Sequence, residues 1–147
     1  MSAKLPGGHK RVLIDTSVWI YHLENHPELG LPAGRVIDSL EEGRFRGIAS
    51  ELTLLELTLR PLQLGRQDVA DHYEVLLDYF PNLEIVPVSR EILLEAAALR
   101  ARRKIRAPDA IQLATGIRAG ATLAVTNDKL WRSVPLIETA LLDDLAQ

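Results

Sequence analysis

Short apolar segments alternate with longer amphipathic segments along this chain, as they do in proteins where strands and helices take turns. The apolar runs predict buried strands at residues 11–15, 45–49, 83–88, 122–126 and 134–138. Residues with helical periodicity predict helices at 17–26, 32–42, 51–60, 68–80, 90–104, 108–119 and 139–146. This alternation predicts an α/β fold, a three-layer α/β/α sandwich with a mainly parallel central sheet.

Capping residues mark several of these boundaries. Side-chain oxygens suited to N-caps precede three of the helices, at Thr16 or Ser17, at Ser50 and at Ser89. Gly43 and Gly120 follow two predicted helix ends, and Pro61 weakens the helical pattern that starts at residue 51. No stretch resembles a long linker, so residues 11–147 are predicted to form one domain after a flexible leader, residues 1–10.

Composition narrows the classes of protein that fit. The chain has 147 residues, is 47% hydrophobic and carries a formal net charge of −3, which excludes a globally basic nucleic-acid-binding protein. A nucleic-acid site would therefore need a local basic patch or bound cations. The absence of cysteine excludes disulfides, zinc–thiolate sites and thiol nucleophiles. No secretory signal or membrane-length apolar run is present, so we predict a cytoplasmic protein without a membrane partner.

Four acidic residues stand where the local pattern is apolar or where a site is expected. Asp15 and Asp128 follow predicted strands, at the sheet edge where parallel sheets bind ligands. Asp109 lies in the first turn of a predicted helix, and Glu56 lies inside the apolar helix "ELTLLELTL". Taken singly, a helix dipole explains Asp109, a turn explains Asp128, and an outward orientation explains Glu56. Their coincidence with Asp15, which completes a buried strand, indicates one shared site.

Carboxylates gathered in one cleft repel each other, and burial increases that cost. A hard divalent cation such as Mg²⁺ or Mn²⁺ prefers oxygen ligands and relieves the repulsion. Such ions bind phosphate oxygens and activate water. A cluster of acids without cysteine or paired histidine ligands therefore points to hydrolysis of phosphodiester bonds.

The segments "VLIDTSVWI", "TLLEL", "APDAIQLATGIRAG" and "LAVTND" follow one another in the order and spacing of the PIN-domain ribonucleases. The chain resembles this family across residues 11–131, and most of all the VapC-like toxins of toxin–antitoxin pairs. The resemblance implies a parallel sheet between helices and metal-dependent cleavage of RNA. It also implies two protein partners, a cognate antitoxin and a second copy of the chain in a homodimer.

The resemblance assigns residues to the family's acidic positions. The four acids, which it implies are both catalytic and metal-binding, are Asp15, Glu56, Asp109 and Asp128. Glu51 lies in the same segment as Glu56, but "TLLEL" matches the family better around Glu56. The polar residues expected to orient the acids are Ser17, Thr126 and Asn127.

Five basic residues precede Asp109: Arg100, Arg102, Arg103, Lys104 and Arg106. They form either a solvated helix end, where cations favour the helix dipole, or a rim that contacts RNA phosphates. His22 and His26 are spaced four residues apart but lack the glutamate of the H-E-x-x-H zinc motif, so surface or interface roles are favoured.

Three other classes of protein could also carry some of these acids. A receiver domain needs paired acids after its first strand, and a haloacid-dehalogenase-like phosphatase needs D-x-D, whereas only Asp15 is present and position 17 is serine. Both are therefore disfavoured. The third is a catalytically silent PIN-like module that binds RNA or protein, and the intact set of acids argues against it.

Overall fold

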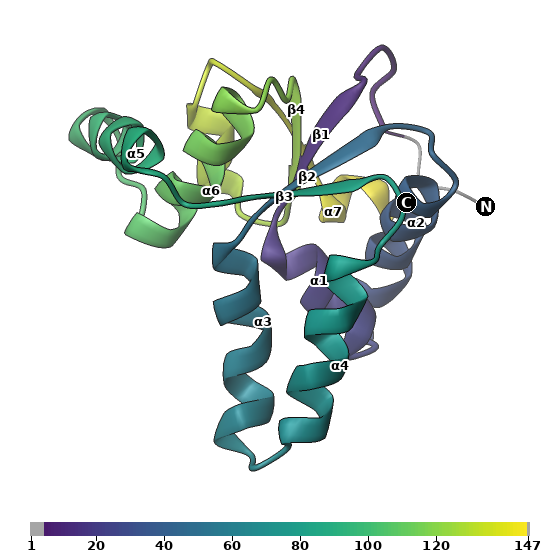
Figure 1. Ribbon diagram of the computed structural model, residues 1–147. Coiled ribbons are helices and arrows are strands. Elements are labelled where there is room, and N and C mark those ends of the chain that lie inside the picture. Colours follow the sequence, from purple (N-terminus) through teal and green to yellow (C-terminus); the bar gives the residue numbers. More distant parts are fainter. Residues whose placement is uncertain (1–4, 147) are drawn as a thin grey trace.

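The structure, a computed structural model, describes residues 5–146 and centres on a five-stranded parallel sheet (Figure 1). The strand order is β3-β2-β1-β4-β5, and each neighbouring pair is parallel. The strands are β1 (Arg11–Ile14), β2 (Arg46–Ser50), β3 (Leu83–Val86), β4 (Leu123–Thr126) and β5 (Glu138–Leu141). The helices are α1 (Thr16–Leu23), α2 (Gly30–Glu41), α3 (Leu52–Gln63), α4 (Gln67–Asp78), α5 (Arg90–Arg102), α6 (Ala107–Arg118), the 3₁₀ helix η1 (Lys129–Ser133) and α7 (Leu142–Leu145).

The two faces of the sheet bury separate cores, because successive strand residues point to opposite sides. Val12 and Ile14 of β1 join the core that includes α1 and α2, whereas Leu13 joins the core that includes α5 and α6. Each core contains one fully buried tryptophan, Trp19 in the first and Trp131 in the second. The predicted three-layer α/β/α sandwich is confirmed, and its sheet is parallel throughout.

Helices α3 and α4 form a hairpin that projects away from the sheet (Figure 1). Its base is anchored in the first core by Leu57 and Leu77, both buried. Helix α3 continues through Pro61 to Gln63, past the predicted end at residue 60. Pro61 lies in the last turn, where its missing N–H removes only one backbone hydrogen bond.

The predicted N-caps agree with the structure at α5 and differ from it at α1 and α3. The N-cap of α3 is Glu51, so the prediction of Ser50 as its cap was wrong, although Ser50 Oγ accepts the Leu52 N–H at 3.1 Å. Ser89 accepts the Ile92 N–H at 3.2 Å and caps α5 as predicted. The N-cap of α1 is Asp15, so the prediction of Thr16 or Ser17 as its cap was wrong. Both hydroxyls donate instead to carboxylates, as the site below shows.

The last strand lies later than predicted. The apolar run 134–138 is a loop whose Val134 and Ile137 pack in the second core, while β5 covers residues 138–141. The prediction of a strand at 134–138 was therefore wrong, and the predicted helix at 139–146 is reduced to α7. Ala140 and Leu141 are buried because β5 pairs with β4. Val134 and Ile137 are buried by packing, without strand pairing.

The segment predicted as a flexible leader, residues 1–10, is described only from Leu5 onward. Leu5 packs against the first core, and His9 Nδ1 forms a 2.7 Å hydrogen bond with Thr122 Oγ1. Among residues 5–146, no helix has both the length and the apolar character needed to cross a membrane.

Candidate active site

Asp15 is a buried carboxylate at the carboxyl end of β1, the central strand of the sheet. Its backbone N–H donates to the Val125 carbonyl of β4 at 3.0 Å, which fixes the main chain at this edge. Its Oδ2 accepts hydrogen bonds from Ser17 Oγ at 2.8 Å and Thr126 Oγ1 at 2.7 Å. Within residues 5–146, Oδ1 accepts no hydrogen bond, so one oxygen is held and the other is left available.

Burial raises the pKa of Asp15 from 3.8 to about 6, because desolvation penalises the charged carboxylate. The hydrogen bonds from Thr126 and Ser17 lower the pKa and oppose part of this effect. The negative charges of Asp109 and Glu56 raise the pKa further. Asp109 and Glu56 therefore lie near enough to Asp15 to act on its charge, although the three carboxylates belong to separate segments of the chain.

Glu56 lies in the middle of α3, half-buried, and its Oε1 accepts two hydrogen bonds. Thr16 Oγ1 donates at 2.8 Å and Gln112 Nε2 donates at 3.0 Å. Thr53, one turn before Glu56, bonds in turn to Thr16 at 2.8 Å. The outward orientation considered from the sequence is excluded. Glu51 is exposed at the N-cap position of α3 and takes no part in these bonds.

Asp109 lies in the first turn of α6, directly after Pro108. Its side chain is 13% exposed, and its Oδ2 lies 3.3 Å from Nε of the exposed Arg106. The helix N-terminus favours a carboxylate at this position. Asp109 therefore interacts favourably with the dipole of α6, and its charge also acts on Asp15.

Asp128 and Asn127 follow β4 and bind backbone amides. Asp128 Oδ1 accepts the Leu130 N–H at 2.9 Å and so caps η1. The charges that shift the pKa of Asp15 are those of Asp109 and Glu56, and Asp128 is not among them. Asn127 Oδ1 accepts the Asp143 N–H at 3.1 Å in the first turn of α7. Thr126 links the two regions, because its Oγ1 donates to Asp15 and accepts the Asp128 N–H at 3.1 Å. The structure thus gathers Asp15, Glu56 and Asp109 and places Asp128 at their margin.

The donor set consists entirely of carboxylate and hydroxyl oxygens, which fits a hard divalent cation. As the side chains stand, no three His, Asp or Glu residues within 5–146 form a group that could hold an ion by themselves. Mg²⁺ commonly takes one or two carboxylates and keeps several waters, so a closed cage is not required. Asp15 Oδ1 and Glu56 Oε2 are free of hydrogen bonds from the described residues. The residues present therefore fit such an ion.

The sequence matches the PIN domain family over residues 12–136. The chain belongs to the PIN-domain family. Solved structures of similar fold include a toxin–antitoxin complex from Klebsiella pneumoniae, at 22% identity and TM-score 0.66 over 86% of this chain and 94% of that one. VapBC2 from Rickettsia felis, bound to a promoter DNA fragment, matches at 18% identity and TM-score 0.70 over 89% and 98%. FitAcB from Neisseria gonorrhoeae matches at 21% identity and TM-score 0.66 over 87% and 95%.

At these identities the likeness to solved structures concerns the fold alone. Among curated protein sequences, none is significantly similar to this chain. The resemblance to the PIN-domain family inferred from four short motifs is confirmed, and the matched range contains all four acids.

Three polar residues beside the acids of this PIN domain were not expected there from the sequence. Thr16, Thr53 and Gln112 are 3%, 1% and 1% exposed, and all three bond within the group around Glu56. A signal was present in the sequence. Thr53 and Glu56 are three residues apart on one helix, and Asp109 and Gln112 repeat that spacing on another, so each pair shares a helix face.

The five basic residues before Asp109 differ in the contacts that they make. Arg100 Nε donates to the Ile105 carbonyl at 2.9 Å, and Arg103 Nε donates to the Ser133 carbonyl at 2.7 Å, so these two stabilise the loop between α5 and α6. Arg106 pairs with Asp109. Arg102 and Lys104 are exposed and make no hydrogen bond or ion pair within residues 5–146. The exposed Arg102 in the last turn of α5 agrees with a solvated helix end, and contact of these residues with RNA phosphates stays a prediction.

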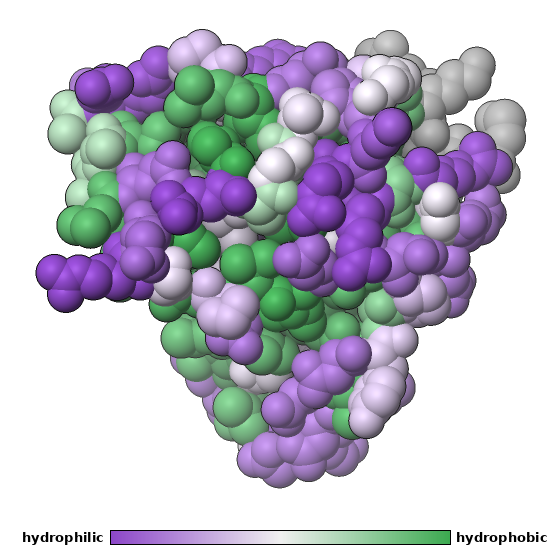
Figure 2. Space-filling model, turned by 45° about the horizontal axis from the view of Figure 1, so that its top comes forward, coloured by the Kyte–Doolittle hydropathy of each residue, from purple (hydrophilic) through white to green (hydrophobic). Residues whose placement is uncertain are grey.

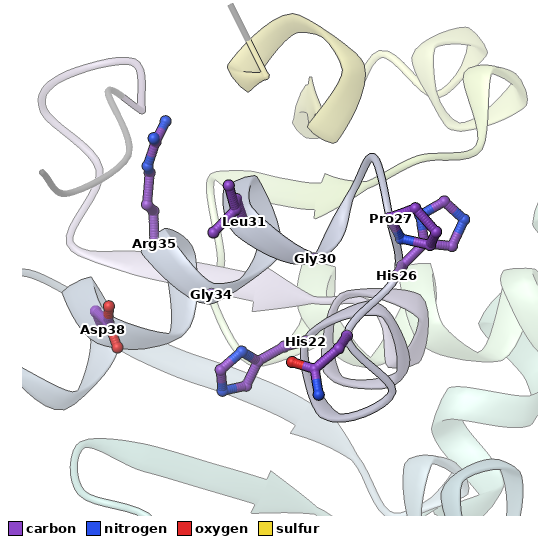
Figure 3. A pocket seen from close by; sticks show the side chains of 9 residues that line it. His22, His26, Pro27, Gly30, Leu31, Gly34, Arg35 and Asp38 are labelled. Atoms are coloured by element: carbon purple, nitrogen blue, oxygen red, sulfur yellow. The ribbon is translucent and has the colours of Figure 1, made fainter.

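A hollow of about 620 Å³ lies between α1 and α2, and none of the four acids lines it (Figure 3). His22 and His26 both line it. His26 Nδ1 accepts the Leu29 N–H at 3.0 Å, so this imidazole caps the turn that leads into α2. In the part of the chain that the structure describes, neither histidine belongs to a group able to hold a metal.

The α3–α4 hairpin carries exposed apolar side chains, and Figure 2 shows hydrophobic surface on it above a hydrophilic tip. On α3 the exposed residues are Leu55, Leu59 and Leu62, which follow one stripe of the helix. On the second helix side they are Val75 of α4 and Tyr79, the residue that follows the end of α4. We call these five residues the hairpin stripe.

Proposed function

We propose that this PIN-domain chain is an endoribonuclease that depends on Mg²⁺ or Mn²⁺ and hydrolyses RNA phosphodiester bonds. The observation that carries the proposal is Asp15, a buried carboxylate with one anchored and one available oxygen, electrostatically coupled to Glu56 and Asp109. Holding a buried carboxylate at a sheet edge with two further acids close to it is costly, and a bound cation would offset that cost.

Asp15, Glu56 and Asp109 are the residues that would hold the ion, and Asp128 would act through a water or a second ion. A divalent ion bound there supplies stabilisation of phosphate charge and a lowered pKa for an attacking water. The protein's own part is orientation. Ser17 and Thr126 hold one oxygen of Asp15, so that the other keeps a fixed position.

The basic loop between α5 and α6 would guide RNA toward the acids despite the net charge of −3. Arg102 and Lys104 have no competing partner among the described residues and are suited to phosphate contacts. Arg106 already sits beside Asp109, where its guanidinium can reach a phosphate bound at the site. Arg100 and Arg103 would support this loop through their backbone hydrogen bonds.

We further propose that the chain is the toxin of a toxin–antitoxin pair and forms a homodimer. The similar structures from Klebsiella pneumoniae and Rickettsia felis are toxin–antitoxin complexes, which supports an antitoxin as partner. The hairpin stripe supports a protein-covered surface, because exposed apolar side chains in helical register commonly mark interfaces.

The function is tested by incubating purified protein with a structured RNA pool in Mg²⁺, Mn²⁺ or EDTA. We expect cleavage that requires the metal and falls by at least about a hundredfold in Asp109→Asn and Glu56→Gln. Glu51→Gln is the matched control, since it removes an exposed carboxylate on the same helix as Glu56. It should cleave as wild type does.

Metal-independent cleavage, or full activity in the Glu56→Gln protein, would contradict the proposal. Folded wild type that binds RNA without cutting any substrate would favour the silent binding module. Binding of the RNA pool is therefore measured alongside cleavage, in EDTA and at low salt, where phosphate contacts are strongest.

A further inference from the structure

Four polar side chains from three helices form a closed hydrogen-bonded group beside the acids. Thr16 comes from α1, Thr53 and Glu56 come from α3, and Gln112 comes from α6. Gln112 is separated from Thr16 by 96 positions in sequence and from Glu56 by 56. The three neutral members are almost fully buried, so each hydrogen bond here is shielded from water.

The hydrogens of this group can be assigned by counting donors. Thr16 Oγ1 donates to Glu56 Oε1, so its 2.8 Å bond with Thr53 must be donated by Thr53. Gln112 Nε2 offers two hydrogens and faces three oxygens, on Thr16 at 2.9 Å, on Glu56 at 3.0 Å and on Thr53 at 3.3 Å. Every donor of the group is directed inward, and Glu56 Oε1 receives two of them.

The orientation of the Gln112 side-chain amide leaves one of its buried polar atoms without a hydrogen bond from the described residues. Its Oε1 is buried and has no hydrogen-bond partner within the described residues. Rotating the amide by half a turn would not help, because its oxygen would then face Glu56 Oε1, with both threonine hydrogens already donated elsewhere. An amide kept in place with one unpaired oxygen indicates that its donors are needed at Glu56.

We propose that Gln112 is a positioning residue of the metal site. Together with Thr16 it binds Oε1 of Glu56 and fixes the carboxylate, leaving Oε2 without a hydrogen bond from the described residues. This inference rests on the proposed metal-dependent function. It adds a residue that touches neither metal nor RNA and acts through Glu56. Partners of this kind change metal affinity by roughly 10- to 100-fold in other metal sites.

The test is the Gln112→Met variant, which keeps the length of the side chain and removes both the amide donors and the unpaired oxygen. Binding of Mn²⁺ alone is measured by calorimetry, and stability is measured by urea unfolding in EDTA. We expect Mn²⁺ affinity to fall by about 10-fold or more while the unfolding midpoint stays the same or rises. A purely structural glutamine would give the opposite result, with lower stability and unchanged Mn²⁺ affinity.

Thr115→Val is the matched control, because Thr115 is also buried on α6 but donates only to the Ile111 carbonyl of its own helix. It should bind Mn²⁺ as wild type does. Should Gln112→Met not fold, Thr16→Val and Thr16→Ser make a second pair, of which only the serine retains the donor to Glu56. The serine protein should bind Mn²⁺ normally and the valine protein about 10-fold more weakly.

The two proposals fail differently. If wild type binds Mn²⁺ and cleaves RNA while the folded variants bind Mn²⁺ equally well, the positioning role is wrong and the ribonuclease stands. If wild type neither binds Mn²⁺ nor cleaves RNA, the metal-dependent function is wrong and the positioning role falls with it.

Discussion

Asp15 is held under two opposing influences, and the balance between them describes the site at the scale of one residue. Burial and the neighbouring carboxylates favour its protonated form, while Thr126 and Ser17 favour the ionised form. The hydroxyls do not fully compensate, since the pKa remains raised to about 6. The folded chain therefore carries a carboxylate whose charge is poorly stabilised until something positive binds beside it.

This imbalance predicts how stability depends on pH in the metal-free protein. The pKa of Asp15 is about 6 in the folded state against 3.8 for an ordinary exposed aspartate, so the folded state binds the proton more tightly. The contribution of protonated Asp15 to the free energy of unfolding is fully present below about pH 4 and is lost as the pH rises through about 6. A difference of this size corresponds to about 3 kcal/mol above that range.

Asp15→Asn should therefore raise the free energy of unfolding by up to about 3 kcal/mol at about pH 8 in EDTA. The gain should shrink as the pH is lowered toward about 4, because wild type then becomes protonated. Urea unfolding at both pH values measures the effect. Asp71→Asn, an exposed change on α4, should alter the free energy of unfolding by no more than about 0.5 kcal/mol. An Asn variant less stable than wild type at the higher pH would contradict the raised pKa.

At the scale of elements, α6 connects the site to the centre of the sheet. Asp109, Gln112 and Gly116 recur at helical spacing along it, so one face of α6 carries an acid, its positioning amide and a contact with β1. Gly116 permits that contact. A Cβ at this position would lie 2.7 Å from Cδ2 and 2.9 Å from Cβ of Leu13, which is fully buried in β1.

Gly116→Ala should therefore destabilise the protein, although alanine is the better helix former. Helix propensity would gain about 1 kcal/mol, whereas overpacking against Leu13 would cost about 1 to 3 kcal/mol. We expect a net loss of roughly 1 to 2 kcal/mol in the free energy of unfolding, measured in urea. The matched control is Gly34→Ala on α2, whose Cβ would meet only the ring of His22, at 3.1 Å from Nδ1. That side chain can move, so the control should be as stable as wild type or more so, and equal losses at both sites would exclude the packing explanation.

The elements that could be predicted from sequence are those whose signals are local. Ser89 and Gly120 mark the start of α5 and the end of α6 through capping and turn chemistry, and the structure agrees. The last strand was misplaced because residues 134–138 are as apolar as a strand, while pairing with β4 selects residues 138–141. Pairing is a property of the assembled sheet and leaves no local mark.

The same distinction separates the parts of the candidate site. Asp15 and Glu56 are visible in sequence because a charge interrupts an apolar pattern. Gln112 is marked in sequence only by its spacing from Asp109, and Thr16 only as a possible cap, because their importance comes from bonds between helices that are far apart along the chain. Asp128 was predicted to join the other acids because it follows a strand. In the structure its side chain accepts a hydrogen bond from a backbone amide of η1.

At the scale of the whole molecule, the sandwich buries its cores and leaves the hairpin stripe exposed. Leu55 and Leu59 on α3 are 59% and 49% exposed, and Tyr79, just after α4, is 81% exposed. These residues lie on a hairpin that projects away from the sheet and is anchored in the first core by Leu57 and Leu77 (Figure 1). A second copy of the chain covering this stripe would remove apolar surface that the fold itself cannot cover.

The homodimer is tested by Leu55→Lys combined with Leu59→Lys. Wild type should have about twice the mass of the 16.3 kDa chain by light scattering, and the double variant should have the mass of one chain, because two ammonium groups cannot be buried unpaired in an apolar interface. Leu31→Lys with Leu136→Lys is the control, since it adds the same charge at leucines that are even more exposed and lie outside the hairpin. That protein should remain a dimer. A monomeric wild type, or a double variant that still dimerises, would instead leave the stripe to the antitoxin, and the same substitutions would then be expected to weaken antitoxin binding.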